Sequence, residues 1–89
     1  MIEAVRIQQV AEIVRRAGLN EQTLAALREH FADLHFTHCL DDDVGAAEPF
    51  QATDGFNIYL VDGRDHCLKL TTDPEAATGL LLAQVEDAA

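Results

Sequence analysis

Two His-Cys dipeptides are the residues of this chain best suited to chemistry. His38-Cys39 and His66-Cys67 contain both cysteines and two of the four histidines among 89 residues. Imidazole and thiolate are the main protein ligands of zinc, and a thiol beside a histidine can act as a nucleophile. Three consecutive carboxylates, Asp41, Asp42 and Asp43, follow the first pair and could hold calcium or magnesium. These residues are the candidates for a metal site or a thiol site.

The backbone expected around the dipeptides works against such a site. Each pair lies in a segment whose pattern predicts a β-strand, where neighbouring side chains point to opposite faces of the sheet. All four residues could converge only if a bulge or a strand end reoriented one of them. The two thiols, Cys39 and Cys67, could share a face if their strands are neighbours. Zinc-binding sequences usually group their ligands by short spacing such as C-x₂-C, which is absent here. Packed thiols and inner-facing histidines are the simpler expectation, with the metal site as the alternative.

The same residues fit catalysis less well than metal binding. A cysteine nucleophile needs an imidazole base within about 3 Å, which adjacent residues on a flat strand do not provide. The acids at 41–43 match a calcium loop only loosely, because such a loop alternates its acids and places a glycine at its sixth position. The chain has no serine and no glycine-rich phosphate loop. We therefore expect no catalytic residue and no cofactor, and the balance leans away from an enzyme.

The charge is strongly negative and unevenly placed. The net charge is −10, yet the first 29 residues carry equal numbers of acids and arginines. All of the excess lies in residues 30–89, where Arg64 and Lys69 are the only basic residues other than histidine. Nucleic acids and anionic membranes need clustered Lys and Arg, so both are excluded as partners. A solvated acidic surface, a basic protein partner or a bound cation remains compatible with this charge, and the solvated surface is the simplest of the three. No apolar run reaches the length of a membrane span, and we expect a cytoplasmic protein.

The N-terminal third has the period of two helices. Apolar residues recur at steps of three and four from Ile2 to Ala17, with charged residues between them. Gly18 can adopt the conformation that ends a helix, and Asn20 can cap the next one. A second apolar stripe runs to about Phe31. Because the connection is short, we expect a helical hairpin.

From residue 34 onward the period changes to two, which is typical of strands. Strands are expected at 34–40, 56–61, 65–71 and 80–85, a mobile loop at 41–55 with a short strand at 50–52, one helical turn at 73–78 and a frayed tail at 86–89. Matching of faces favours a three-residue turn at 62–64, which pairs Leu60 with His66 and Phe56 with Leu70. In this register Tyr59 pairs with Cys67 on the second face.

This order, α-α-β-β-β-short α-β, predicts one α+β domain over residues 1–89, with the helical hairpin packed on one face of a small antiparallel sheet. The core is expected to join two sets of residues. They are Leu34, Phe36, Phe56, Ile58, Leu60, Leu68 and Leu70 of the sheet and Val10, Ile13, Leu24, Leu27 and Phe31 of the helices.

Four stretches together carry a resemblance to a known family. They are Leu34-His35-Phe36-Thr37 leading to Asp41-Asp42-Asp43, the run from Gly55 to Gly63, His66-Cys67-Leu68 and the run from Thr71 to Gly79. They resemble a family of small bacterial proteins of unknown function that is associated with nitrogen-fixation gene neighbourhoods. The resemblance implies a cytoplasmic accessory protein and brings no activity or functional residue with it.

Function is therefore expected to lie in a non-enzymatic accessory or protein-interaction domain that binds a protein partner or forms a homo-oligomer. The final strand, Leu80 to Val85, could provide an edge for such pairing. Under the resemblance, the partner would be a component of nitrogenase maturation or electron supply. The alternative is a small metal- or thiol-dependent factor that uses Cys39 and Cys67 with nearby histidines.

Overall fold

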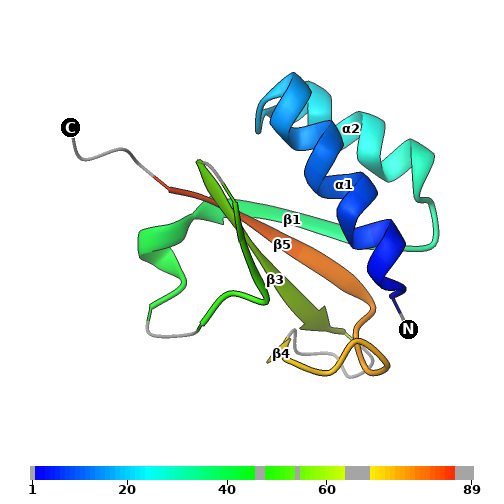
Figure 1. Cartoon of the computed structure of the whole chain (residues 1–89), viewed down its shortest axis with the longest axis vertical. Helices are drawn as coiled ribbons and strands as arrows, with labels where there is room; N and C mark the ends of the chain where they lie inside the picture. The colour runs from blue at the N-terminus through cyan, green and yellow to red at the C-terminus, as the bar shows by residue number, and fades with distance from the viewer. Residues whose placement is uncertain (1, 46–47, 54, 64–68, 86–89) are drawn as a thin grey trace.

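In the computed structural model of the chain, the described residues form two α-helices, a short 3₁₀ helix and a five-stranded sheet (Figure 1). The structure describes residues 2–45, 48–53, 55–63 and 69–85. In chain order, the elements are α1 (Ala4–Ala17), α2 (Glu21–His30), β1 (His35–Leu40), the 3₁₀ helix η1 (Asp41–Asp43), β2 (Gln51–Thr53), β3 (Phe56–Asp62), β4 (Lys69–Thr71) and β5 (Gly79–Gln84). The predicted α+β class, with two helices before the strands, is confirmed.

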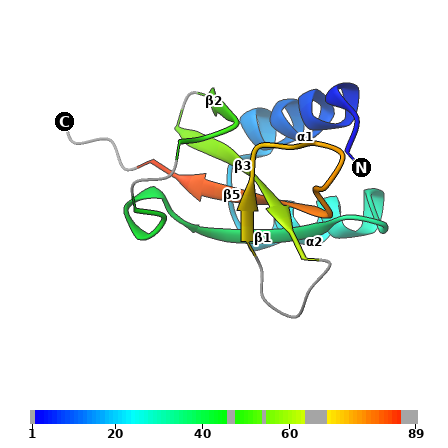
Figure 2. The ribbon, with the colours of Figure 1, turned by 90° about the horizontal axis from the view of Figure 1, so that it is seen from below.

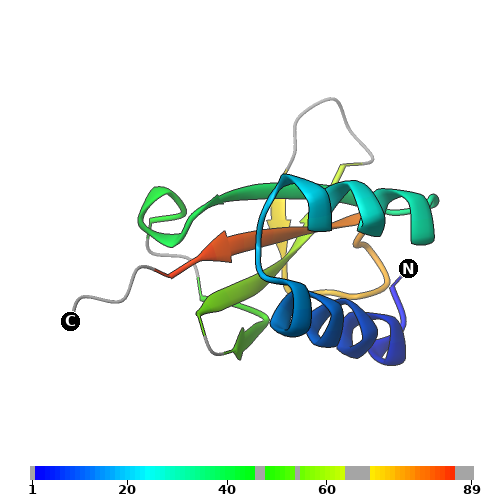
Figure 3. The same ribbon diagram turned by 90° about the horizontal axis from the view of Figure 1, so that it is seen from above.

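Both helices lie over the same face of the sheet, with α2 over β1 and α1 on the side of β2 (Figure 3). The predicted caps are present. Gly18 ends α1 with a φ of 86°, and the Asn20 side chain accepts a hydrogen bond of 2.9 Å from the Thr23 N–H. Two positions of the predicted apolar stripe are wrong, because Val5, which is 58% exposed, and Ala17 both face solvent. Ile7, two residues after Val5 and therefore on nearly the opposite side of α1, is buried.

The core lies between the helices and the inner face of the sheet. We call this face inner and the opposite one outer. Alternation along β3 and β5 sends Ile58, Leu60, Leu80 and Leu82 inward, where all four are fully buried. Complete burial of each such side chain stabilises the fold by roughly 1.5–3 kcal/mol. The inner-face residues pack in one cluster with Val10, Val14, Leu24, Leu27, Phe31 and Phe36.

The strand order, β1-β5-β3-β2, differs from the expected antiparallel arrangement in one pair. β5 lies between β1 and β3, antiparallel to β3 but parallel to β1. The sheet is therefore mixed. Alternation specifies the faces of a strand but not the direction of its neighbour, so the sequence pattern could not reveal the parallel pair. The last strand is central, which excludes the expected edge-to-edge pairing through it.

The predicted hairpin register is wrong. Among the described residues, β4 pairs with the end of β3, through Leu60 with Thr71, Val61 with Leu70 and Asp62 with Lys69. The first half of β3 pairs on the same side with β2 instead. Asp62 still belongs to β3, so the turn expected at 62–64 does not begin there. The expected partners of Leu60 and Tyr59, His66 and Cys67, lie outside the described residues.

The helical turn expected at 73–78 is a tight turn without a helix. The Asp73 carbonyl accepts a hydrogen bond of 3.1 Å from the Ala76 N–H, and the Asp73 carboxylate accepts one of 3.0 Å from the Glu75 N–H. Gly79 then begins β5, so too few residues remain for a helix. The Pro74 carbonyl accepts a hydrogen bond from the Ile2 N–H, which fastens the N-terminus to this turn.

Candidate functional site

The first His-Cys pair is divided between the two faces of β1. His38 pairs with Leu82 and lies on the inner face, whereas Cys39 pairs with Ala83 on the outer face. The Nε2 atom of His38 is buried, and no hydrogen-bond partner for it occurs in the described part of the chain. One dipeptide therefore does not supply two ligands to one site, as alternation predicts.

The predicted metal site is only partly described. His66 and Cys67 lie outside the described residues, so a site that joins them to Cys39 stays a prediction. Within residues 2–45, 48–53, 55–63 and 69–85, no three His, Cys, Asp or Glu side chains gather to hold a metal ion. Of the three candidate aspartates, Asp41 is already bound by other side chains, whereas Asp42 and Asp43 are exposed.

Asp41 is the anchor of a small polar cluster on the outer face. Its Oδ1 atom accepts hydrogen bonds of 2.8 Å from the Tyr59 hydroxyl and 2.9 Å from the Asn57 Nδ2. Tyr59 is only 3% exposed. Burial, then the hydrogen bond and charge of Asp41, raise the pKa of Tyr59. This carboxylate fastens the chain after β1 to β3 and has a structural role that its place in an acidic run did not suggest.

Cys39 lies beside this cluster as a half-buried thiol. Burial raises its pKa most, and the negative charges of Asp43 and Asp41 raise it further. The thiolate is the reactive form of cysteine, so such a thiol stays protonated at neutral pH. Reactive cysteines lie in electropositive surroundings, and Cys39 has the opposite environment.

The outer face also carries an exposed apolar side chain. Figure 2 looks onto this side of the sheet, with the helices behind it. Leu70 of β4 is 42% exposed and lies between two hollows. The smaller hollow, of about 210 Å³, is lined by Thr37, Val61, Lys69, Leu70 and Leu81. The larger one, of about 430 Å³, is lined by Glu48, Tyr59, Leu60, Leu70, Thr71 and Thr72. Sequence reasoning placed Leu70 in the core, and the wrong hairpin register is the reason.

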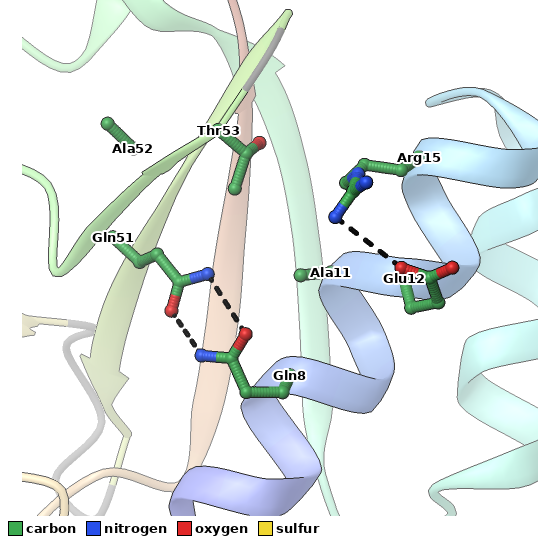
Figure 4. Close-up of a pocket in the computed structure, with 7 residues that line it drawn as sticks. All are labelled: Gln8, Ala11, Glu12, Arg15, Gln51, Ala52 and Thr53. Carbon is green, nitrogen blue, oxygen red and sulfur yellow. Dashed lines mark hydrogen bonds and ion pairs between the residues drawn. The ribbon is translucent and has the colours of Figure 1, made fainter.

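A second hollow region, polar and open, lies between α1 and β2 (Figure 4). Its volume is about 660 Å³. The amides of Gln8 and Gln51 cross it and bond each other reciprocally, at 2.7 and 3.4 Å. Arg15 pairs with Glu12 at 3.4 Å on the helix side. Because these polar side chains form hydrogen bonds and an ion pair with one another, we interpret the groove as a contact between helix and sheet rather than a ligand site.

Comparison with known proteins identifies the family of this chain. Residues 7–85 match a family of unknown function, DUF6129. The chain belongs to the DUF6129 family. The match spans nearly the whole DUF6129 fold described above, from α1 to the end of β5. No curated protein and no solved structure matches this family member. Among its described residues, no helix is both long and apolar enough to cross a bilayer. The resemblance to a family of unknown function is thus confirmed, and its nitrogen-fixation part remains a proposal.

Proposed function

We propose that this family member is a non-enzymatic accessory domain that binds another protein through the outer face of its sheet. The observation that carries this proposal is the exposure of Leu70 between two hollows. Full burial of a leucine side chain is worth roughly 1.5–3 kcal/mol, and Leu70 forgoes part of this in the isolated chain. A partner that covers it gains that free energy.

The neighbours of Leu70 support a surface rather than an isolated exposed residue. Leu81 is half-buried and Thr37 is exposed, and both line the hollow beside it. Single exposed apolar residues are ordinary on proteins, whereas apolar side chains around a hollow are typical of interaction sites. The opposite face of the same sheet is covered by the two helices, so only the outer face can serve in this way.

We also propose that the partner belongs to nitrogen fixation, in nitrogenase maturation or electron supply. The support is the resemblance of residues 34–37, 41–43, 55–63, 66–68 and 71–79 to proteins from nitrogen-fixation gene neighbourhoods. A chromosomal deletion, tested for growth on dinitrogen and on ammonium, checks this part separately. Equal growth of wild type and deletion strain on dinitrogen contradicts it and leaves the binding proposal standing.

Capture of partners with a matched pair of variants tests the binding proposal. Leu70→Asp places a charge in the outer face, and Val5→Asp places the same charge on the exposed side of α1. Tagged wild type, L70D and V5D are used to capture proteins from nitrogen-fixing cells, with circular dichroism to confirm folding. We expect proteins that wild type and V5D retain and L70D loses. Equal capture by all three overturns the proposal.

The thiol- or metal-dependent alternative is tested in the same experiment. A double variant, Cys39→Ser with Cys67→Ser, removes every thiol of the chain. If the accessory proposal holds, this variant captures the same proteins as wild type. Loss of capture in the double variant, with the fold intact, favours the alternative instead.

A further inference from the structure

We propose that the outer face takes a cationic segment of its partner, with one apolar side chain seated beside Leu70 and Lys or Arg residues against Asp42, Asp43 and Glu48. This inference rests on the proposed binding function and adds the chemistry of the partner. It follows from the shape of the smaller hollow, the charges around the larger one and the net charge of the chain.

The smaller hollow defines the apolar part of the ligand. Val61, Leu70 and Leu81 line it together with the exposed Thr37, and its volume is about 210 Å³. Alternation places Thr37, Leu81 and Val61 on one face of three neighbouring strands, so the floor is rigid sheet rather than loop. Such a floor suits one branched or aromatic side chain of a partner.

Charge defines the rest of the ligand. Glu48 is exposed and lines the larger hollow, on the other side of Leu70. The Tyr59 side chain lines the same hollow, and its hydroxyl donates a hydrogen bond of 2.8 Å to Asp41. The exposed Asp42 and Asp43 are the next two residues of the chain, in the same short 3₁₀ helix as Asp41. Lys69 lines the opposite hollow. A ligand is therefore expected to direct its cations toward Glu48 and the aspartates, and its apolar group toward Leu81.

A second copy of the chain is a poor occupant of this surface. Each copy carries a net charge of −10, and all of the excess lies in residues 30–89. Two such faces would bring their acids together, and like charges across an interface cost free energy and slow association. A cationic partner gains from the same field that repels a second copy.

Selection from a displayed library of random peptides tests the chemistry without knowledge of the natural partner. The folded wild-type chain is the bait, and binders that also bind L70D are discarded. We expect the enriched peptides to share an apolar residue flanked by Lys or Arg. A synthetic peptide from the winners, free of tyrosine and tryptophan, is then titrated against the chain. Because Tyr59 is the single tyrosine and tryptophan is absent, its fluorescence reports occupancy of the face.

The variant Asp42→Asn/Asp43→Asn/Glu48→Gln measures the charge contribution. We expect it to weaken peptide binding by about tenfold, equivalent to about 1.4 kcal/mol. A control, E21Q/E29Q/E75Q, removes the same charge from exposed positions elsewhere and should change affinity little. Salt should weaken the wild-type complex, because the Debye length falls from about 30 Å at 0.01 M to about 3 Å at 1 M.

The outcomes separate the two proposals. Enriched peptides without basic residues, or equal affinity of wild type and the D42N/D43N/E48Q variant, overturn the cationic partner even if L70D abolishes binding. In that case the outer face remains a binding surface. If every enriched peptide also binds L70D and is therefore discarded, or if no peptide is enriched at all, both the cationic ligand and the site assigned to it are overturned.

Discussion

Asp41 and Tyr59, 18 residues apart in the chain, are joined by a hydrogen bond of 2.8 Å across the outer face. The bond closes the start of the acidic loop onto the central part of the sheet. Because Tyr59 is buried and Asp41 is a carboxylate, the contact is a charge-assisted hydrogen bond in partly desolvated surroundings, where such bonds are strongest. It also sets the position from which Asp42 and Asp43 reach solvent.

Tyr59→Phe is expected to lower the free energy of unfolding by about 2 kcal/mol, because a hydrogen bond to a charged group is lost in a buried place. Urea unfolding followed by circular dichroism measures this. The double variant with Asp41→Asn should lose less than the sum of the single losses, since both changes break the same bond. Additive losses would show that the two side chains do not interact.

The ionisation of Tyr59 should make the fold sensitive to alkali. Its pKa is raised by burial, by its hydrogen bond to Asp41 and by the charge of Asp41, so folding favours the neutral phenol. The stability from this shift is complete below the ordinary tyrosine pKa of about 10 and is lost as pH rises through the higher folded value. Absorbance of the single tyrosine should therefore titrate above pH 10 in the folded chain. Titration at the pH of a free tyrosine contradicts this.

Local features of the fold were predictable because local chemistry specifies them. The helix break at Gly18 and the cap at Asn20 follow from backbone freedom and side-chain hydrogen bonding within a few residues. The strand ending before Asp41 follows from the poor strand propensity of aspartate. These features need no knowledge of distant partners.

Long-range features were not predictable in the same way. The position of β5 between β1 and β3 depends on how distant strands pack, and alternation is the same for a central and an edge strand. The register of β4 depends on β2, which occupies the other half of β3 and leaves Leu70 exposed. The hollow beside Leu70 could not be found from the sequence, whereas separation of His38 from Cys39 could, because it follows from strand geometry alone.

Gly79 should tolerate no side chain. A Cβ atom at this position would lie 2.4 Å from the His35 carbonyl oxygen and 2.8 Å from the His35 Cβ. The contact joins β5 to its parallel neighbour β1, so relief of the clash would displace the strands. We expect Gly79→Ala to cost about 1–3 kcal/mol, as overpacking does elsewhere. Gly45→Ala, where a Cβ meets nothing within 4 Å, is the control and should cost less despite its φ of 83°. The reverse order in urea unfolding would exclude the clash.

Asp33 should contribute to the acid sensitivity of the fold. Two hydrogen bonds of 2.5 and 3.0 Å join its carboxylate to Arg6, which also lies over the Phe31 ring. The hydrogen bonds from Arg6 lower the pKa of Asp33, with a smaller contribution from the Arg6 charge. Its stabilisation is therefore present above the ordinary aspartate pKa and is lost as pH falls through the lower folded value.

Asp33→Asn should thus flatten the acid side of the stability profile more than Asp42→Asn, an exposed aspartate that serves as the control. The effect should be modest and should shrink in high salt, because the Asp33 side chain is 68% exposed. Urea unfolding at a series of acidic pH values, in low and high salt, measures both trends. Identical pH profiles of stability for D33N and wild type would show that the ion pair between Arg6 and Asp33 does not contribute to acid sensitivity.

Cys39 should react slowly with iodoacetamide at neutral pH. Burial, Asp43 and Asp41 all raise its pKa, so only a small fraction is present as the reactive thiolate. The measurement uses Cys67→Ser, which leaves Cys39 as the single thiol, and compares its rate with that of free cysteine. Addition of Asp43→Asn removes one of the two charges and should speed the reaction, whereas Glu29→Gln on α2 should not. A rate that equals that of free cysteine and is unaffected by D43N would show that the surroundings of Cys39 do not disfavour the thiolate. That result would support a thiol-dependent factor.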